Sequence, residues 1–394
     1  MPNQFFSPEG DLENYFVTES WLIDQWVGDE LWTWGRNDVS QLGINATGNR
    51  STPVTTFAGG TNWKQVAGGF KNKAAIKTDG TLWTWGINSF GILGDNTSVT
   101  KSTPVTTFAG GTNWRQVSSA QYHAAAIKTD GTLWCWGLNQ YSQIGINATG
   151  ARSTPVTTFS GGTNWKQVSC GGGHIAATKT DGTLWLWGRN SFGGIGDNTT
   201  VHRSTPVTTF AGGTNWKQVS GGGVFTAAIK TDGTLWLWGY NNYGNLGDNT
   251  TIQKNTPITT FTGGTNWKQV SSGGYHTAAI KTNGTLWTWG YGARGELGDN
   301  TITLKKSIPS TTFSGGTNWK QISGGDSHTA AIKTDGTLWI WGSSAYAQLG
   351  ANDSIQKNTP VTSFAGGTNW KQVSAEFRHT SAVFSGTTPD LPIS

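Results

Sequence analysis

Cysteine is nearly absent from this sequence of 394 residues, which contains only Cys135 and Cys170. Two thiols at non-equivalent positions form neither a disulfide framework nor a metal-ligand pattern. Charged residues are few, at 12%, and no apolar run is long enough to span a bilayer. The start, MPNQFFSPEGDLE, lacks the basic and apolar regions of a signal peptide, so we predict that the chain is made and folded in the cytoplasm.

Glycine and tryptophan, by contrast, are abundant, with 57 and 23 residues. Many glycines and aromatic residues with little charge favour short strands joined by turns over long helices. The formal net charge is +5, although the first 30 residues hold seven acidic residues and no lysine or arginine. Many of the lysines recur once per repeat, so their charges would be spaced around the ring. Charges spaced in this way are usually solvated rather than gathered into a docking patch, so we do not expect a nucleic-acid partner.

Two tryptophan motifs recur along almost the whole chain. The first tryptophan of Leu-Trp-x-Trp-Gly falls at positions 32, 83, 134, 185, 236, 287 and 339. The tryptophan of Gly-Thr-Asn-Trp falls at positions 63, 114, 165, 216, 267, 319 and 370. The period is therefore 51 residues, with one residue inserted in the sixth unit, and these motifs contain 21 of the 23 tryptophans. Seven copies of one unit indicate a repeat architecture.

Each unit predicts about four short strands. The segment TNWKQV ends in a glycine- and serine-rich loop, AAAIK follows as an apolar strand, and TDG is a hairpin turn. In TLWTWG the residues alternate, so both tryptophan rings face one side and leucine and threonine face the other. The proline of STPVTTF suits an outer strand. Four strands in one such period are typical of a propeller blade, and no stretch has the apolar period of a helical solenoid.

The two ends of the chain hold complementary parts of one unit. The first unit starts at GDELWTWG without a preceding AAIKTDG strand, and the last unit finishes at HTSAVFSG without a following tryptophan strand. We therefore predict an all-β, seven-bladed β-propeller in which the N-terminal strand completes the last blade and removes the open edge. The predicted organisation is an arm at 1-28, the propeller at 29-386 and a tail at 387-394.

These motifs resemble the RCC1 repeat family, the regulator of chromosome condensation type. The match lies in LWTWGRNDVSQLG, LWTWGINSFGILGDNT, STPV, WKQVSSGGYHTAAIKTNG and their copies, over roughly residues 29 to 386. The resemblance implies a seven-bladed propeller, and family members include guanine-nucleotide exchange factors, chromatin binders and interaction platforms. The fold can therefore be transferred to this chain, whereas the activity cannot.

The sequence departs from the exchange-factor members, which use acidic and histidine side chains on loops of one face. The position before the recurring histidine holds no acidic residue, and the first position of the Gly-x-Leu-Gly loops holds no histidine. Exchange activity is therefore not expected. No Ser-His-Asp set, carboxylate pair or phosphate-cradling loop stands out from the repeat, so we predict neither an enzyme nor a cofactor.

The recurring residues have structural explanations. Tryptophans locked to the repeat are expected to fill the space between blades rather than to stack on sugars. One repeat position holds histidine in five copies and asparagine or phenylalanine in the other two: His123, His174, His276, His328, His379, Asn72 and Phe225. Since phenylalanine serves equally well there, we interpret the histidines as packed or hydrogen-bonded residues and predict no metal site.

The residues that differ between copies are predicted to lie on one face. The GGxxH loop enters the strand that runs to TDG, and the chain returns along TLWTWG into the WGxN loop, so both loops lie at the same end of a blade. Tyr, Arg and Phe, which often carry interface hot spots, occur there, whereas the TDG end is nearly constant. Neutral variation of exposed loops is the alternative interpretation. The predicted binding face comprises Arg36, Lys71, Tyr122, Arg189, Val224, Tyr240, Tyr275, Tyr291, Asp326, Phe377 and Arg378.

Residues 1-28 lie outside the repeat and are acidic and aromatic. Ser7 before Pro8 suits a helix start, an apolar spacing of 3.6 residues follows, and Gly28 suits the helix end. This amphipathic helix either packs on the side of the propeller or anchors the ring to a larger assembly. The predicted anchor residues are Phe5, Phe6, Tyr15, Phe16, Trp21 and Trp26.

These observations favour a non-enzymatic binding propeller without membrane insertion. The favoured hypothesis is a phage virion appendage, such as a decoration or receptor-binding protein, with a virion scaffold and a host-surface receptor as its partners. The first alternative is an intracellular RCC1-like regulator that binds a protein partner, a GTPase or chromatin. The second alternative is a lectin, in which a glycan stacks on Tyr122, Tyr240, Tyr275 and Tyr291.

Overall fold

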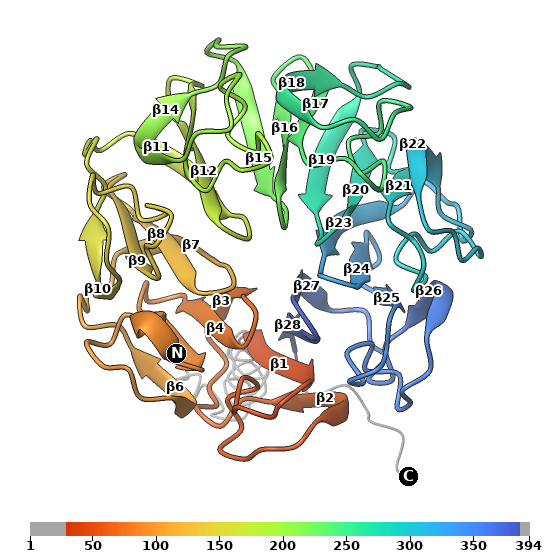
Figure 1. The fold of residues 1–394 in the computed structure, drawn as a ribbon. Helices are drawn as coiled ribbons and strands as arrows, with labels where there is room; N and C mark the ends of the chain where they lie inside the picture. The colour runs from red at the N-terminus through yellow and green to blue at the C-terminus, as the bar shows by residue number, and fades with distance from the viewer. Residues whose placement is uncertain (1–28, 387–394) are drawn as a thin grey trace, which may run out of the picture.

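The computed structural model describes residues 29–386, which form seven four-stranded antiparallel sheets around a central axis (Figure 1). Within this range the only helical element is one 3-10 turn, η1 (Ser89–Gly91). The prediction of an all-β, seven-bladed propeller is therefore confirmed. The predicted helical arm at 1–28 and tail at 387–394 lie outside the described residues.

The four strands of each blade follow one another from the axis to the outside of the ring (Figure 1). The innermost strands are β3 (Trp63–Gly68), β7 (Trp114–Ser119), β11 (Trp165–Cys170), β15 (Trp216–Gly221), β19 (Trp267–Ser272), β23 (Trp319–Gly324) and β27 (Trp370–Ala375). The second strands are β4 (Asn72–Lys77), β8 (His123–Lys128), β12 (His174–Lys179), β16 (Phe225–Lys230), β20 (His276–Lys281), β24 (His328–Lys333) and β28 (His379–Ser385).

The outer half of each blade contains the Leu-Trp-x-Trp-Gly motif and the proline strand. The third strands are β5 (Leu82–Gly86), β9 (Leu133–Gly137), β13 (Leu184–Gly188), β17 (Leu235–Gly239), β21 (Leu286–Gly290), β25 (Leu338–Gly342) and β1 (Asp29–Gly35). The outermost strands are β6 (Lys101–Thr106), β10 (Arg152–Thr157), β14 (Arg203–Thr208), β18 (Lys254–Thr259), β22 (Lys306–Thr311), β26 (Lys357–Thr362) and β2 (Arg50–Thr55).

The two ends of the chain meet in one sheet, whose strand order is β2-β1-β28-β27. β1 pairs with β28 from Asp29 opposite Ser385 to Gly35 opposite His379. Closure of the ring by the N-terminal strand is therefore confirmed. The N-terminal part supplies two strands of this blade rather than one, because β2 pairs with β1 as its outer neighbour. Pro53 is tolerated in β2 because this strand is the outer edge of its sheet.

Tryptophans fill the spaces between neighbouring sheets, as the sequence predicts. Trp63 of β3 makes edge-to-face contacts with Trp83 and Trp85 of β5, with ring centroids 6.3 Å apart in both pairs. The indole N–H of Trp85 donates a hydrogen bond to the carbonyl oxygen of Gln41 in the neighbouring blade, at 3.1 Å. Such pairs combine a large buried apolar area with a satisfied polar group.

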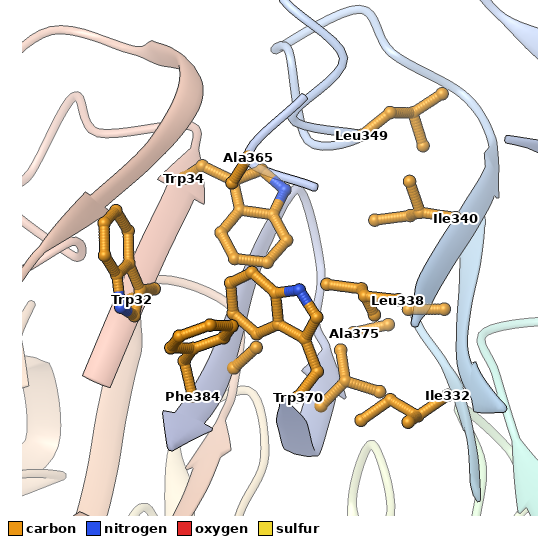
Figure 2. Packing of buried hydrophobic residues seen from close by; sticks show 13 residues of the cluster. Trp32, Trp34, Ile332, Leu338, Ile340, Leu349, Ala365, Trp370, Ala375 and Phe384 are labelled. Carbon is orange, nitrogen blue, oxygen red and sulfur yellow. The ribbon is translucent and has the colours of Figure 1, made fainter. Parts of the chain in front are cut away.

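The aromatic cluster at the closure combines residues from both chain ends (Figure 2). The ring centroid of Trp370 lies 6.4 Å from Trp32, 6.3 Å from Trp34 and 4.9 Å from Phe384. In the six other blades a lysine takes the place of Phe384 and stacks on the tryptophans, as Lys77 does. The closing blade therefore has an aromatic ring where the other blades have a cation.

Glutamine side chains connect the innermost strands of neighbouring blades. Gln65 donates its side-chain N–H to the carbonyl oxygen of Val117 and accepts a bond from the Val117 N–H, both at 3.1 Å. The same pair of bonds joins Gln372 to Val66 at 2.8 Å and thereby closes the ring. A single repeat does not reveal this contact, because the partner lies in the next copy.

The recurring histidines are buried and bond across the blade boundaries. His276 Nε2 lies 2.9 Å from the hydroxyl oxygen of Thr329, and two further histidines make the equivalent contact. Burial lowers the pKa of His276 to about 4, so the ring is neutral near pH 7. These contacts agree with the hydrogen-bonded role predicted for the histidines. Within residues 29–386, no group of three His, Cys, Asp or Glu side chains is placed to hold a metal ion.

Phenylalanine already occupies the repeat position of His276 in another copy, as Phe225. Replacing His276 with phenylalanine is therefore expected to lower the free energy of unfolding by only about 1 kcal/mol. Thr329 loses one contact but still donates to the carbonyl oxygen of Glu296 at 2.9 Å. The folded-state pKa of His276 lies below the unfolded value of about 6.5, so its contribution to stability is present above that pH and falls toward pH 4. The variant should therefore lose less stability on acidification than the wild type.

Urea unfolding at about pH 7 and about pH 5 measures both effects of His276→Phe. The reverse substitution, Phe225→His, is the matched control and should make the acid loss steeper. If acidification lowered the free energy of unfolding of His276→Phe as much as that of the wild type, His276 would not be the buried neutral group described above.

Candidate functional site

The two variable loops of each blade are tied together by one backbone hydrogen bond. The residue after the Trp-Gly pair donates its N–H to the carbonyl oxygen of the residue that precedes the second strand. The distance is 3.0 Å from Arg36 to Arg378 and 2.9 Å from Tyr291 to Tyr275. The same bond joins Ile87 to Lys71, Leu138 to Tyr122, Arg189 to Gly173, Tyr240 to Val224 and Ser343 to Ser327. We call the end of the ring formed by these seven loop pairs the variable face.

The opposite end, which we call the constant face, consists of the turns between second and third strands and the loops that follow the outermost strands. In the β4–β5 turn, Asp79 accepts bonds from the N–H and hydroxyl of Thr81, at 2.9 and 2.7 Å, and these bonds lower the pKa of Asp79. Gly80 has a φ of +79°, and a Cβ atom there would lie 2.0 Å from the carbonyl oxygen of Thr112. The geometry of the turn therefore explains why its sequence hardly varies.

Tyr243 lies at the centre of a group of aromatic rings on the variable face. Its ring centroid lies 4.9 Å from Tyr291, 5.3 Å from Tyr275 and 6.1 Å from Tyr240. Phe192 extends the group, with its ring 5.3 Å from that of Tyr240. We call these five residues the aromatic patch.

The sequence analysis predicts three members of the aromatic patch and misses Tyr243 and Phe192. Both precede the first residue of a Gly-x-Leu-Gly loop. That repeat position is aromatic in five of seven copies: Phe90, Tyr141, Phe192, Tyr243 and Tyr346. This recurrence is the signal in the sequence that identifies the position as part of the face.

A charged cluster occupies another part of the variable face. The guanidinium groups of Arg36 and Arg378 lie 5.0 and 4.7 Å from the ring centroid of Tyr346. Asp38 pairs with Arg36 at 2.6 Å and with Lys71 at 3.1 Å. Partial burial opposes ionisation of Asp38, but hydrogen bonds from neighbouring side chains lower its pKa. The cluster therefore stays ionised and carries three positive charges against one negative charge.

Phenylalanines extend the variable face toward the axis. The rings of Phe70 and Phe377 lie 4.0 Å apart, and Tyr122 lies 6.1 Å from Phe70 and 5.6 Å from Phe90. Arg189 lies over the ring of Tyr141, at 5.1 Å. Arg189 also lies 5.8 Å from the ring centroid of Phe192, and Arg378 lies 4.8 Å from that of Phe377, so arginine side chains connect these groups of rings.

An open pocket with a volume of about 380 Å³ lies on the axis at the variable face. Its wall is largely the glycine-rich backbone of the loops before the second strands. Five of the predicted binding residues line this pocket: Arg189, Val224, Tyr275, Asp326 and Phe377. The other six lie outside its lining. Burial raises the pKa of Asp326, which accepts a hydrogen bond from the Ser327 hydroxyl at 2.8 Å. The lining of the pocket thus contains two acidic residues, Asp326 and Glu376, one basic residue, Arg189, and several apolar residues.

Three ionisable side chains form a buried cluster below the variable face, between the blade that closes the ring and the blade that contains β4. Glu376 Oε2 lies 3.4 Å from Lys73 Nζ and 2.7 Å from His379 Nε2, and all three residues are fully buried. Lys73 also donates to the hydroxyl of Ser381. Burial lowers the pKa of Lys73 to about 8, whereas the charge of Lys73 lowers the pKa of Glu376 against the effect of burial.

The sequence analysis does not find the pair Lys73 and Glu376, although each stands where other copies have a small or uncharged residue. The space for the Glu376 side chain depends on Gly68, because a Cβ atom there would lie 2.1 Å from the carboxyl carbon of Glu376. These two changes, in separate copies, are explained only when the two copies are seen to be neighbours.

The predicted anchor residues Phe5, Phe6, Tyr15, Phe16, Trp21 and Trp26 lie outside the described residues. The part of the chain that the structure describes contains no helix with the length and apolar character needed to cross a membrane.

A closed ring of seven similar blades with one constant and one variable face defines a β-propeller built from a tandem repeat. The model of the RCC1-like domain matches residues 22–262, and the model of the regulator of chromosome condensation (RCC1) repeat matches residues 283–332 and 335–383. The chain therefore belongs to the RCC1 repeat family, as its motifs predict.

Two curated relatives come from Arabidopsis thaliana. The chain is 30% identical to the ultraviolet-B receptor UVR8 over 330 residues, which are 81% of this chain and 74% of that protein. It is 28% identical to the mitochondrial RCC1 domain-containing protein RUG3 over 303 residues, which are 73% of this chain and 67% of that protein.

Two solved structures have a similar fold. Human WBSCR16 has a TM-score of 0.81 at 21% identity, and the match covers 91% of this chain and 100% of that chain. Yeast RCC1 (Prp20), in its structure with Kap60, has a TM-score of 0.80 at 16% identity over 92% of this chain and 90% of that chain. At these identities the two structures support the fold alone.

Proposed function

We propose that the chain is a non-enzymatic binding propeller whose variable face holds a protein partner. The observation that carries the proposal is the contrast between the faces of one ring, since residues differ from blade to blade at one end and repeat at the other. The variable face offers an uncharged aromatic patch, a basic cluster around Tyr346 and a pocket on the axis. Large areas of such mixed chemistry suit a protein surface.

The relatives favour a regulator, the first alternative of the sequence analysis. Yeast RCC1 (Prp20) is bound to Kap60 in its solved structure, so a propeller of this fold can hold a protein partner. UVR8 is a receptor by name. None of the relatives reported above is a virion protein, so the phage appendage, its virion scaffold and its host receptor have no support beyond the sequence.

The lectin alternative also gains no support from the geometry. Tyr240, Tyr275 and Tyr291 belong to the aromatic patch, but Tyr122 contacts Phe70 and Phe90 instead. The four rings therefore do not form the single sugar-stacking site that this alternative requires.

The double variant Tyr275→Ser/Tyr291→Ser tests the proposal. Because buried tyrosines at an interface each contribute on the order of 2 kcal/mol, we expect the affinity for the co-purifying partner to fall by about 100-fold or more. Phe210→Ser is the matched control, since it removes an exposed ring from the constant face, 69% exposed, and should leave binding unchanged. Unchanged binding by the double variant, or equal loss in the control, would count against the variable face.

A nucleotide-release assay with a panel of small GTPases separates a binding propeller from an exchange factor. We expect no acceleration of release, because the loops lack the acidic and histidine pattern of the exchange-factor members. Acceleration by the wild type, lost in Tyr275→Ser/Tyr291→Ser, would replace our proposal by exchange activity on the same face.

A further inference from the structure

A ring of exposed phenylalanines lies on the constant face. Each loop that follows an outermost strand has a phenylalanine as its second residue, and six of the seven are 63 to 69% exposed: Phe57, Phe108, Phe159, Phe210, Phe261 and Phe313. These loops lead to the asparagine whose carbonyl oxygen accepts a bond from the neighbouring turn, as Asn62 does from the Thr78 N–H at 2.8 Å. One exposed phenylalanine is ordinary, but the repeat places one in each of six successive copies, so a segment that crosses this face can contact several of them.

The constant face is also basic. The second residue of every innermost strand is lysine or arginine, such as Lys64 and Lys371, and a lysine precedes each of the six turns. The acidic residues of the turns are five aspartates, each of which accepts bonds from its own threonine, as Asp79 does. Positive charge therefore exceeds negative charge on this face, so a second copy of the same face would be repelled.

Residues 1–28 join the ring on this face. Asp29, the first residue of β1, forms a backbone bridge with Asn62, and its carboxylate pairs with Lys371 at 2.8 Å. Asn62 ends the loop that contains Phe57. The preceding 28 residues span about 40 Å as a helix and more when extended, so several of the phenylalanine loops lie within their reach.

We infer that residues 1–28 pack across the constant face, with their aromatic side chains on the exposed phenylalanines and their carboxylates on the lysines. This segment carries five acidic residues and no lysine or arginine, and its apolar residues include six aromatic rings. Both properties complement the face at which the segment ends and joins the ring. Of the two roles that the sequence leaves open for the arm, the inference selects packing on the ring.

Carbodiimide coupling on the full-length protein tests this contact, because it joins a carboxylate only to a lysine that touches it. Mass spectrometry should find Glu9, Glu13 or Glu19 coupled to lysines of the constant face, such as Lys64 and Lys371. An equal mixture of isotope-labelled and unlabelled protein should show these couplings within one molecule. Coupling should decrease as the salt concentration rises, since exposed ion pairs are screened.

The variant Phe57→Ser/Phe108→Ser should reduce this coupling roughly tenfold, because it removes two of the aromatic contacts nearest the segment. Phe90→Ser is the matched control, since Phe90 is 49% exposed but lies on the variable face. Coupling between labelled and unlabelled molecules would assign the face to a second copy, and coupling to Lys71 would place the segment on the variable face. Either result, or no coupling at all, would overturn the inference.

Discussion

Replacing Glu376 with glycine is expected to lower the free energy of unfolding by about 3–5 kcal/mol, whereas adding Lys73→Thr to the same chain should recover most of that loss. Without the carboxylate, the ammonium group of Lys73 stays fully buried with only polar partners such as the Ser381 hydroxyl. The double variant recreates the preceding junction of the ring, which has Gly325 and Thr380 at these positions. Uncharged replacements of a buried ion pair are often neutral or stabilising.

Denaturant unfolding of the two single variants and the double variant measures this coupling between Lys73 and Glu376. Glu296→Gln is the matched control, because Glu296 is also a buried carboxylate and burial raises its pKa to about 7. Three other copies have glutamine at this position, so a change below about 1 kcal/mol is expected there. If the free energy of unfolding of Glu376→Gly were no lower than that of the double variant, the pair of Lys73 and Glu376 would not be coupled as described.

Replacing Trp370 with alanine is expected to lower the free energy of unfolding by about 3–5 kcal/mol. It should also weaken the ring where the two ends of the chain meet in one sheet. Trp370 is buried and contacts Trp32 and Trp34 from the N-terminal part and Phe384 from the C-terminal part (Figure 2). Its removal leaves a cavity between strands that no covalent link joins, because β1 and β28 are paired only by hydrogen bonds. The loss should therefore be concentrated at β1 and β28.

Hydrogen exchange locates the effect of Trp370→Ala within the ring. We expect amides of β1 and β28 to exchange faster than in the wild type, since local opening needs less free energy there. Trp216→Ala is the matched control: it should cost a similar amount but accelerate exchange in its own blade, around β15 to β17. Unchanged exchange of β1 and β28 in Trp370→Ala would mean that the aromatic cluster does not hold the closure.

The fold could be predicted almost completely because one period recurs seven times. The alternation in Leu-Trp-x-Trp-Gly predicts the third strand of each blade, and Pro53 and its counterparts mark the outer strand. What a repeat does not reveal is contact between copies. The bonds of Gln65 to Val117 and of His276 to Thr329 run to the next blade, so they appear only when the ring is assembled. For the same reason the place of β2 in the last blade was not predicted.

The candidate face could be predicted in position but only partly in content. Strand directions alone place the WGxN and GGxxH loops at one end, and the bond between Tyr291 and Tyr275 joins them. The loop that contains Tyr243 has no regular strand pattern, so its ring was not assigned to the face. Glu376 was missed because its partner Lys73 is about 300 residues away in the sequence, at the opposite end of the repeat array.

The central claim is that the repeated residues build the ring and the varied residues bind. Hydrogen exchange tests this claim most directly, measured on the protein alone and on its complex with the partner that co-purifies from its native source. One blade is enough for the comparison, because it contains variable loops at one end and a constant turn at the other. We expect slower exchange on binding in the variable loops around Tyr275 and Tyr291, and no change in the β20–β21 turn around Asn283. Slower exchange at that turn, with the two loops unchanged, would contradict the claim.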